Sequence, residues 1–359
     1  MNGHYSANMA ESRVPNLKDV AREAGVHVAT ASRALSDDQS HLVSEATKAR
    51  VHAVAEGLGY RTNAVAQSLR RGRTGTIGVV VADLANSFVV SLLRGIEHEA
   101  RTGTYTPLVA ETHDDPAILR SVVIRLLRNQ VDCIILSAAQ VDDEDFVTDL
   151  ERRVPVVLAV RGFGSSGLAG AERRHLEVLP DDFVGARVAV EHLLTLGHRR
   201  IAQIPGTFQI SSFVERARGF DAAMREHPEA SDVSTGAHAP ESTVEEGRRQ
   251  AEMLLRQPPD RRPTAVFAHN DLMAIGAIDA IRAARLRCPE DISVVGYNDA
   301  PLVDHFDPPL TTVRLPGFEL GRRSARIAFD LLEGVRPTDV RQMLEPEFIE
   351  RGSTSANFP

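Results

Sequence analysis

The stretch LKDVAREAGVHVATASRAL, residues 17–35, has apolar side chains at helical spacing on both sides of one glycine. Leu17, Val20 and Ala24 repeat at intervals of three or four residues before Gly25, and the pattern resumes at Val28. Because glycine readily ends a helix and lets the chain turn, the pattern predicts two short helices joined by a tight turn.

A third short helix is expected soon after this pair. Ser44 is a suitable N-cap, Glu45 lies in the first turn, and apolar residues continue on one face as far as Leu58. Three short helices around one apolar centre make an all-α headpiece, which we place at residues 15–60. Residues 1–14 are expected to be a disordered tail. Residues 61–74 are expected to be a hinge, because this segment is too polar and too short to form a stable helix alone.

From Thr76 onward, apolar runs alternate with longer amphipathic stretches. This alternation is typical of parallel sheets with crossover helices, and about 260 residues of it exceed one compact sheet. We therefore expect an α/β core of two lobes over residues 75–359. The N-lobe should contain residues of about 75–177 and 314–343, and the C-lobe about 178–313 and 344–359. The predicted strands are IGVVVA (77–82), PLVAE (107–111), VDCIIL (131–136), VPVVLAV (154–160), RIAQIP (200–205), TAVFAH (264–269) and SVVGY (293–297).

Charge is distributed unevenly along the chain. The first 74 residues carry ten Lys or Arg and seven Asp or Glu, a formal net charge of +3, although the whole chain carries −8. A basic N-terminal module on an acidic body fits a protein whose small headpiece contacts DNA, and Arg70, Arg71 and Arg73 supply a local cluster.

The lengths of the apolar runs and the cysteine spacing indicate the cellular compartment. No apolar run is long enough to span a membrane, and residues 1–13 lack the apolar segment of a signal peptide, so we expect a cytoplasmic protein with no membrane partner. Cys133 and Cys288 lie in different segments without C-x-x-C spacing, so we expect reduced thiols and no zinc site.

The headpiece and the core together resemble the lactose/galactose repressor (LacI/GalR) family. The family pattern V-A-x-x-A-G-V-x-x-x-T-x-S-R is matched by Val20, Ala21, Ala24, Gly25, Val26, Thr30, Ser32 and Arg33. Further matches follow in order: VAQSL (65–69), IGVVVADLANSFV (77–89), HLLTLGHRRIAQIPG (192–206), ERARGF (215–220), PTAVFAHNDLMAIGAIDAI (263–281), VVGYND (294–299), PPLTTV (308–313) and ERGST (350–354). The resemblance implies a ligand-responsive, sequence-specific DNA-binding regulator, a repressor, whose core is similar to periplasmic binding proteins.

The resemblance assigns the second helix of the headpiece to the DNA major groove. Val28, Ala29 and Arg33 are expected at base edges, where arginine suits guanine and the two small apolar side chains offer contact only to groups such as the thymine methyl. Residues expected to contact DNA phosphates are Thr30, Ser44, Thr47 and Asn63. His27 replaces the family's usual serine, which caps this helix and touches phosphate. We expect His27 to touch phosphate at most, and not to cap the helix.

The resemblance also implies that residues 63–70 fold into a helix on operator DNA. Leu69 is then expected to wedge into the minor groove at the central base step, the alternative being a leucine that packs between helices. A pair of headpieces on one pseudo-palindrome requires a homodimer. The partners expected are therefore a double-stranded DNA operator, a small-molecule effector and a second copy of the chain.

The effector is expected in the cleft between the lobes, near the strand ends. Matching to the family pocket gives Asn86, Phe88, Arg216, Asn270 and Asn298. Ordinary structural roles remain open for them: a core position for Phe88, and surface or helix-capping positions for Arg216 and Asn270. A sugar or related metabolite is the expected class, although Asn298 replaces a common aspartate and Ser242 a common aromatic platform, and both departures argue against a simple sugar.

Other function classes find less support. Gly162, Gly164 and Gly167 match G-x-G-x-x-G, but no apolar-faced helix follows and the preceding strand is not the first of its lobe, so we expect a surface loop and no cofactor. The chain lacks the G-x-S-x-G and H-E-x-x-H motifs, so we do not expect an enzyme. A transport-type solute-binding protein is the remaining alternative, and the headpiece argues against it.

Overall fold

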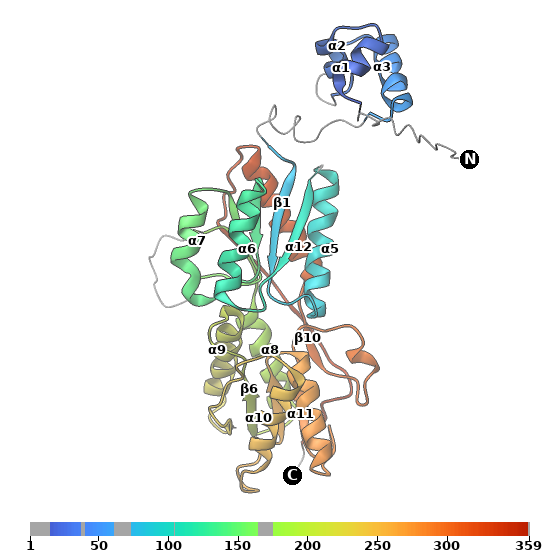
Figure 1. The fold of residues 1–359 in the computed structure, drawn as a ribbon. Coiled ribbons are helices and arrows are strands. Elements are labelled where there is room, and N and C mark those ends of the chain that lie inside the picture. The colour runs from blue at the N-terminus through green and yellow to red at the C-terminus, as the bar shows by residue number, and fades with distance from the viewer. Residues whose placement is uncertain (1–14, 37–39, 61–72, 104, 164–174, 358–359) are drawn as a thin grey trace, which may run out of the picture. The chain divides into compact units, whose positions relative to one another are not determined.

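The computed structural model describes residues 15–36, 40–60, 73–103, 105–163 and 175–357. The chain divides into two compact units, Met1–Thr74 and Gly75–Pro359 (Figure 1). The expected tail at residues 1–14 lies outside the described residues, as does most of the expected hinge.

The first unit contains the expected short helices. They are α1 (Leu17–Glu23), α2 (Val28–Ala34) and α3 (Glu45–Gly57), with a 3₁₀ turn, η1 (Ser40–Leu42), between α2 and α3. Their small core is formed by Val20, Ala21, Ala24, Ala31, Ala34, Val51 and Ala55. Alanine at most of these positions lets the helices approach closely, so a headpiece of few residues still encloses a core.

The N-lobe is built on a parallel sheet of strand order β11-β5-β4-β3-β1-β2. The strands are β1 (Thr76–Val81), β2 (Thr106–Glu111), β3 (Cys133–Leu136), β4 (Val156–Ala159), β5 (Glu177–Pro180) and β11 (Arg341–Leu344). The central strands are buried on both faces, which explains their nearly continuous apolar sequences.

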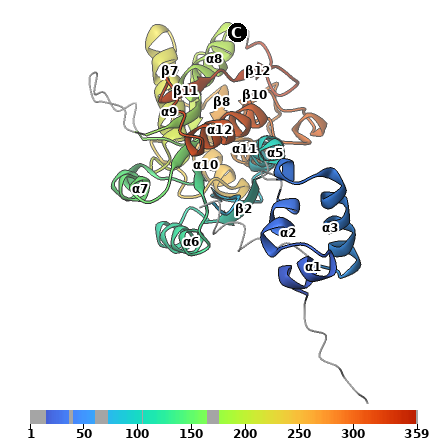
Figure 2. The same ribbon diagram turned by 90° about the horizontal axis from the view of Figure 1, so that it is seen from above.

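Helices cover both faces of this sheet (Figure 2). On one face, α5 (Ser87–Thr102) and α12 (Gly317–Leu332) enclose one apolar cluster, and on the other α6 (Pro116–Arg128) and α7 (Glu144–Glu151) enclose a second. A 3₁₀ turn, η2 (Val141–Asp143), leads into α7. A Cβ atom added to Gly95 of α5 would lie 2.0 Å from the Phe318 carbonyl oxygen of α12. Glycine therefore permits this close helix crossing.

The C-lobe repeats the arrangement on a smaller sheet of order β7-β6-β8-β9. Its strands are β6 (Arg200–Ile204), β7 (Ser231–Asp232), β8 (Ala265–Ala268) and β9 (Ser293–Val295). Helices α8 (Asp182–Thr195) and α9 (Ser211–Glu226) cover one face, and α10 (Val244–Leu255) and α11 (Asp271–Ala283) cover the other. None of the helices in the described residues has the length and apolar character needed to span a bilayer.

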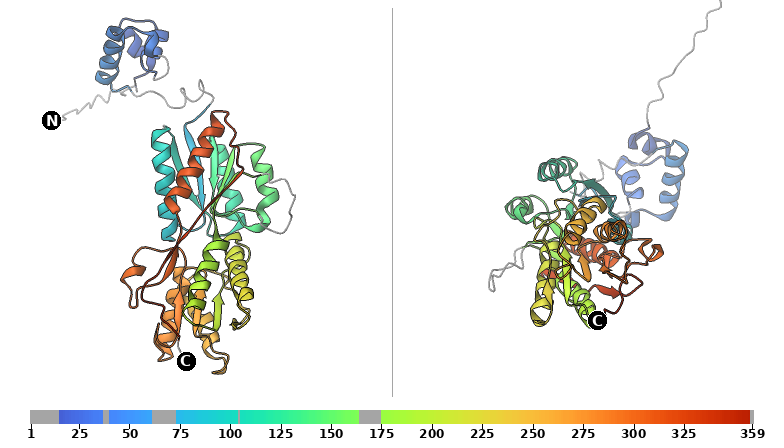
Figure 3. Two further views of the ribbon diagram at one scale, coloured as in Figure 1. Left: turned by 180° about the vertical axis from the view of Figure 1, so that it is seen from behind. Right: turned by 90° about the horizontal axis from the view of Figure 1, so that it is seen from below.

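The chain passes between the lobes after β5, after β10 (Thr312–Arg314) and after β11 (Figure 3). Strand β10 pairs with β12 (Glu347–Ile349) in an antiparallel ribbon, and η3 (Val303–His305) precedes β10. Because β5 pairs with β4 and β11, the N-lobe sheet extends to Pro180 and Leu344.

His198 ties the segment after β12 to the C-lobe sheet. Its Nδ1 lies 3.0 Å from the Thr264 hydroxyl, and its Nε2 lies 3.1 Å from both the Ser293 hydroxyl and the Ser355 carbonyl. Burial lowers the pKa of His198 to about 4. His198, Ser293 and Ser355 are thus parts of one hydrogen-bonded contact.

This contact predicts a pH dependence of folding stability. The folded pKa of His198 lies below its ordinary value of 6.5, so the unfolded chain takes up the proton first as the pH falls. The stabilisation by neutral His198 is complete above pH 6.5 and is lost towards pH 4, by at most about 1.4 kcal/mol per pH unit. Urea unfolding between pH 7.5 and 4.5 should show a steeper loss of unfolding free energy for the wild type than for His198→Asn. Parallel curves for the two proteins would contradict this role.

Candidate DNA-binding surface and effector cavity

The turn between α1 and α2 sets the direction of the second helix. Gly25 has a φ of +64°, a left-handed conformation that glycine adopts without steric cost. A capping box between Asn16 and Asp19 fixes the start of α1. The turn is therefore defined by local sequence.

His27 caps α2, and our sequence-based expectation on this point was wrong. Its Nδ1 accepts a hydrogen bond of 3.2 Å from the backbone N–H of Ala29, and His27 has the extended backbone typical of an N-cap. The ring nitrogen next to Cγ occupies the place of a serine or asparagine oxygen. A histidine with an unprotonated Nδ1 therefore satisfies an orphan N–H at the start of the helix.

The predicted DNA-reading residues differ in exposure. Ala29 and Arg33 are exposed on α2, whereas Val28 and Thr30 are half-buried and Val28 packs against the headpiece core. Helix α2 thus offers solvent one long cationic side chain and one methyl group. At the start of α3, the Ser44 hydroxyl caps the helix and donates to the half-buried Thr47 hydroxyl at 3.0 Å. Asn63 and Leu69 lie outside the described residues.

In the core, Arg216 is buried and makes its described contacts within the C-lobe. Its Nε lies 2.9 Å from an Asp182 carboxylate oxygen, and its Nη1 donates to the His269 carbonyl. Its guanidinium carbon lies 3.8 Å from the centre of the Tyr297 ring, which adds a cation–π contact. Burial raises the pKa of Asp182, and the Arg216 charge opposes that rise. Burial, together with the Arg216 charge, holds the pKa of His269 well below its usual value.

The other predicted effector residues lie at element starts and turns. Asn270 caps α11 through Oδ1, which accepts from the Met273 N–H at 2.7 Å, and its Nδ2 donates to the Ser242 carbonyl at 3.1 Å. Asn298 has a φ of +112°, a strained conformation for a residue with a side chain. In the N-lobe, Asn86 caps α5 and the half-buried Phe88 packs against apolar clusters of both lobes.

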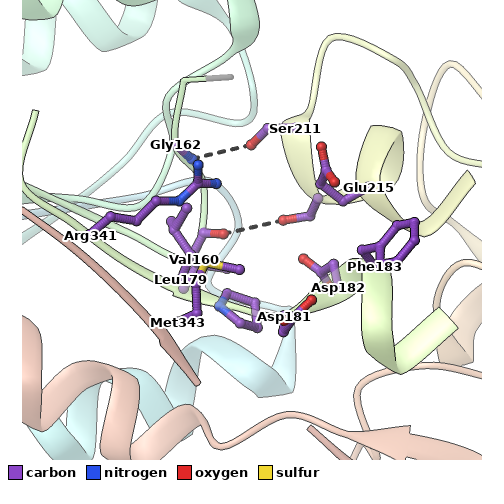
Figure 4. A pocket seen from close by; sticks show the side chains of 12 residues that line it. Val160, Gly162, Leu179, Asp181, Asp182, Phe183, Ser211, Glu215, Arg341 and Met343 are labelled. Atoms are coloured by element: carbon purple, nitrogen blue, oxygen red, sulfur yellow. Dashed lines mark hydrogen bonds between the residues drawn. The ribbon is translucent and has the colours of Figure 1, made fainter. Parts of the chain in front are cut away.

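A cavity of about 210 Å³ lies between the lobes (Figure 4). None of the five predicted effector residues lines it. The N-lobe contributes residues at the ends of β4 and β5 and on β11: Val160, Gly162, Leu179, Pro180, Arg341 and Met343. The C-lobe contributes the starts of α8 and α9: Asp181, Asp182, Phe183, Ser211, Ser212 and Glu215. Arg216 does not line the cavity, but its ion-pair partner Asp182 does.

Sequence reasoning missed these cavity residues. Asp181 and Asp182 carry a recognisable signal, since they directly follow the buried strand β5 and polar residues at that end of a parallel strand often face a ligand site. Arg341 carries none, because its position depends on the late strand β11 joining the first sheet. Gly162 donates its N–H to Ser211, whereas Gly164 and Gly167 lie outside the described residues.

Hydrogen bonds join the N-lobe to the C-lobe beside the cavity. The Val141 N–H donates to the Gln209 carbonyl at 2.9 Å, the Gly162 N–H to the Ser211 hydroxyl at 3.2 Å, and the Ser212 hydroxyl to the Val160 carbonyl at 3.3 Å. We call these bonds the interlobe clasp.

Val160, whose carbonyl accepts the Ser212 bond of the clasp, lies in a strained turn. Its φ is +70°, and the Arg161 N–H donates to the Ala159 carbonyl at 2.7 Å across it, which makes a classic γ-turn. A β-branched residue in this conformation is rare. Such strain persists where surrounding contacts hold it, commonly at ligand clamps and switches.

Comparison with known proteins decides the family. Residues 16–63 match the model of bacterial regulatory proteins of the lacI family, and residues 190–354 match a periplasmic binding protein-like domain. The HTH-type transcriptional repressor PurR of Aliivibrio fischeri is 31% identical over 94% of this chain and 98% of its own length. The repressor CytR of Escherichia coli K12 is 30% identical over 95% and 96%.

This chain belongs to the LacI family. Solved structures agree: a Lac repressor dimer bound to operator and the anti-inducer ONPF has a TM-score of 0.83 at 28% identity, covering 96% of this chain and 100% of that one. A complex of the regulator CelR with cellobiose has a TM-score of 0.69 at 30% identity, with coverages of 94% and 99%. The expected fold class is confirmed. The LacI-family chain is a ligand-responsive, DNA-binding transcriptional regulator, and the relatives named here are repressors.

The cap on α2 can be tested by substitution. His27→Ala removes the acceptor for the Ala29 N–H and should lower the stability of α2 by about 1 kcal/mol, whereas His27→Ser should retain most of it. Hydrogen exchange of the α2 amides in the full chain measures the difference. Equal protection in the alanine and serine variants would show that the ring does not act as a cap.

The clasp predicts a second measurable effect. Ser211→Ala removes the acceptor for the Gly162 N–H, so exchange of this amide should accelerate by about fivefold or more, since a net hydrogen bond contributes about 1 kcal/mol. Ser212→Ala breaks another bond of the clasp but keeps the acceptor for the Gly162 N–H, so it should accelerate this amide less. Unchanged exchange of Gly162 in Ser211→Ala would mean that the bond to Ser211 does not protect this amide.

Proposed function

We propose that this LacI-family chain is a repressor that binds a pseudo-palindromic operator as a homodimer under the control of a small molecule. The exposed face of α2 carries the proposal, because it presents Arg33 and Ala29 to solvent on the second helix of a helix-turn-helix. Arg33 reads guanine through paired hydrogen bonds, and Ala29, with the half-buried Val28, contributes apolar contact to a neighbouring base.

The remaining headpiece positions act on the DNA backbone in this proposal. Thr30, Ser44 and Thr47 offer hydroxyl groups near helix starts, where phosphates bind favourably. Asn63 contacts phosphate from the hinge, and Leu69 wedges into the minor groove. We propose residues 15–60 as the headpiece, 61–74 as the hinge and 75–359 as the core. Within the core, the N-lobe contains residues of about 75–177 and 314–343, and the C-lobe about 178–313 and 344–359.

For the effector, we propose that Asn86, Phe88, Arg216, Asn270 and Asn298 surround a ligand site between the lobes. The strained backbone of Asn298 and the contacts of Phe88 with both lobes support this placement. Arg216 lies in a buried ion pair, so it acts on a ligand by holding Asp182 at the cavity wall. We also propose that the chain does not act as an enzyme, since its named relatives are repressors.

The dimer surface is proposed from exposed apolar side chains. Strand β2 forms an edge of the N-lobe sheet, and its Leu108 and Val109 are exposed. Val90 on α5 and Ile124 on α6, helices that contact β2, are exposed as well. An uncovered strand edge flanked by apolar side chains suits pairing with a second copy. A dimer of this kind presents two headpieces to the two halves of an operator.

Selection of binding sites from randomised double-stranded DNA tests the function. The wild type should enrich a pseudo-palindrome with a central pyrimidine–purine step at a stated salt concentration. Arg33→Ala should lose roughly 5- to 150-fold in operator affinity and lose its preference at one base pair in each half-site.

Arg22→Ala is the matched control for lost charge, because Arg22 is exposed on α1. It should weaken binding evenly across sequences without changing the motif. Selection that enriches no motif, both alone and with a cell extract of metabolites, would refute the proposed function.

A further inference from the structure

The cavity between the lobes has more acidic than basic side chains in its wall. Asp181, Asp182 and Glu215 face it from the C-lobe, and Arg341 faces it from the N-lobe. Figure 4 shows Arg341 and Met343 on one side and Asp182, Phe183 and Glu215 on the other. Any ligand therefore meets a wall that favours positive charge.

Most of these charges already have partners within the protein. Asp182 is paired with Arg216, and an oxygen of Glu215 lies 2.9 Å from Arg218. The Arg341 guanidinium lies 3.3 Å from a Glu177 carboxylate oxygen. Because the cation of Arg341 is compensated and stands opposite carboxylates, the cavity is a poor site for an anion.

Asp181 is the exception. Its Oδ1 accepts the Val184 N–H at 3.0 Å and so caps α8, and no ion pair of Asp181 is found among the described residues. The side chain is half-buried at the wall of the cavity. A carboxylate in such a recess is less well solvated than one at the surface, and a bound cation would compensate it.

The rest of the wall is apolar. Val160, Leu179 and Met343 line the N-lobe side, and Phe183 lies across from them. Met343 is 44% exposed, so its side chain is accessible to a ligand in the cavity. The cavity thus combines carboxylates with an apolar surface over a small volume.

We propose that this cavity binds a small organic cation, with a protonated amine against Asp181 and Glu215 and a short apolar chain against Val160, Leu179 and Met343. The inference rests on the proposed function, in which a small molecule binds between the lobes. It specifies the chemical class of ligand for this cavity, which is not lined by the five effector residues proposed above. A neutral sugar could donate hydroxyl hydrogen bonds to Asp181 but would bring no opposite charge.

Compounds of equal chain length and different charge test the proposal. Calorimetry at pH 7 and low ionic strength, with the full-length protein, would compare 1,4-diaminobutane, 1,4-butanediol and succinate. The diamine should bind saturably and at least tenfold more tightly than the diol, and succinate should not bind, since a charge-assisted hydrogen bond contributes more than a neutral one. Binding of the diol or of succinate as tight as that of the diamine, or binding of none of them, would overturn it.

Asp181→Asn locates the site. Asparagine is as good an N-cap as aspartate, so the variant keeps the start of α8 and loses only the charge. Diamine affinity should fall about tenfold or more. Asp115→Asn is the matched control: Asp115 caps α6 in the same way, is exposed and does not line the cavity, so this variant should bind like the wild type. Equal affinity in the two variants would overturn the assignment to Asp181.

Operator binding separates this inference from the proposed function. Binding of the same protein preparation to the selected DNA motif is measured first. This measurement is made without ligand, or with the cell extract if the selection enriched a motif only in its presence. A protein that binds its motif but not the diamine refutes the cation site alone. A protein that binds the diamine but selects no motif refutes the regulator and leaves the cation site supported.

Discussion

The ion pair between Arg216 and Asp182 joins the parts of the C-lobe on which both proposed ligand regions depend. It connects α9 to α8, and the guanidinium also reaches the carbonyl after β8 and the ring after β9. A buried pair of this kind contributes little net stability, but loss of one partner leaves an uncompensated charge and costs about 3–5 kcal/mol. The pair therefore fixes geometry: it holds α8 and α9 with their first residues at the wall of the cavity.

The fold was predictable because local and long-range signals agree. Gly25 and Ser44 mark helix ends that the structure contains, and the apolar runs from 77 to 297 coincide with strands that are largely buried in the two sheets, except for the edge strand β2. Periodicity reports which face of an element is buried, and burial dominates the folding of such elements. Strands β5, β7, β10, β11 and β12 were not predicted. In β11, for example, the sequence RQML has no strong apolar alternation, and the strand is placed by pairing with β5.

The sites were predictable only in part. Motif matching places Arg33 on an exposed helix face, but it gives no account of Arg216, whose guanidinium binds Asp182 and the His269 carbonyl inside the protein. The cap by His27 was missed because residue preferences describe the average side chain, whereas capping needs only an acceptor within reach of the Ala29 N–H. The cavity depends on strand ends from distant parts of the chain, so no single segment of sequence indicates its charge.

Strand β11 and the segment held by His198 have a consequence for synthesis of the protein. Residues 341–344 complete an edge of the N-lobe sheet, and Ser355 joins the C-lobe through hydrogen bonds with His198, Pro289 and Ser293. During synthesis the headpiece precedes the core and can fold locally, whereas both lobes need residues 341–355 before they are complete. A DNA-reading module is thus finished well before the part that controls it.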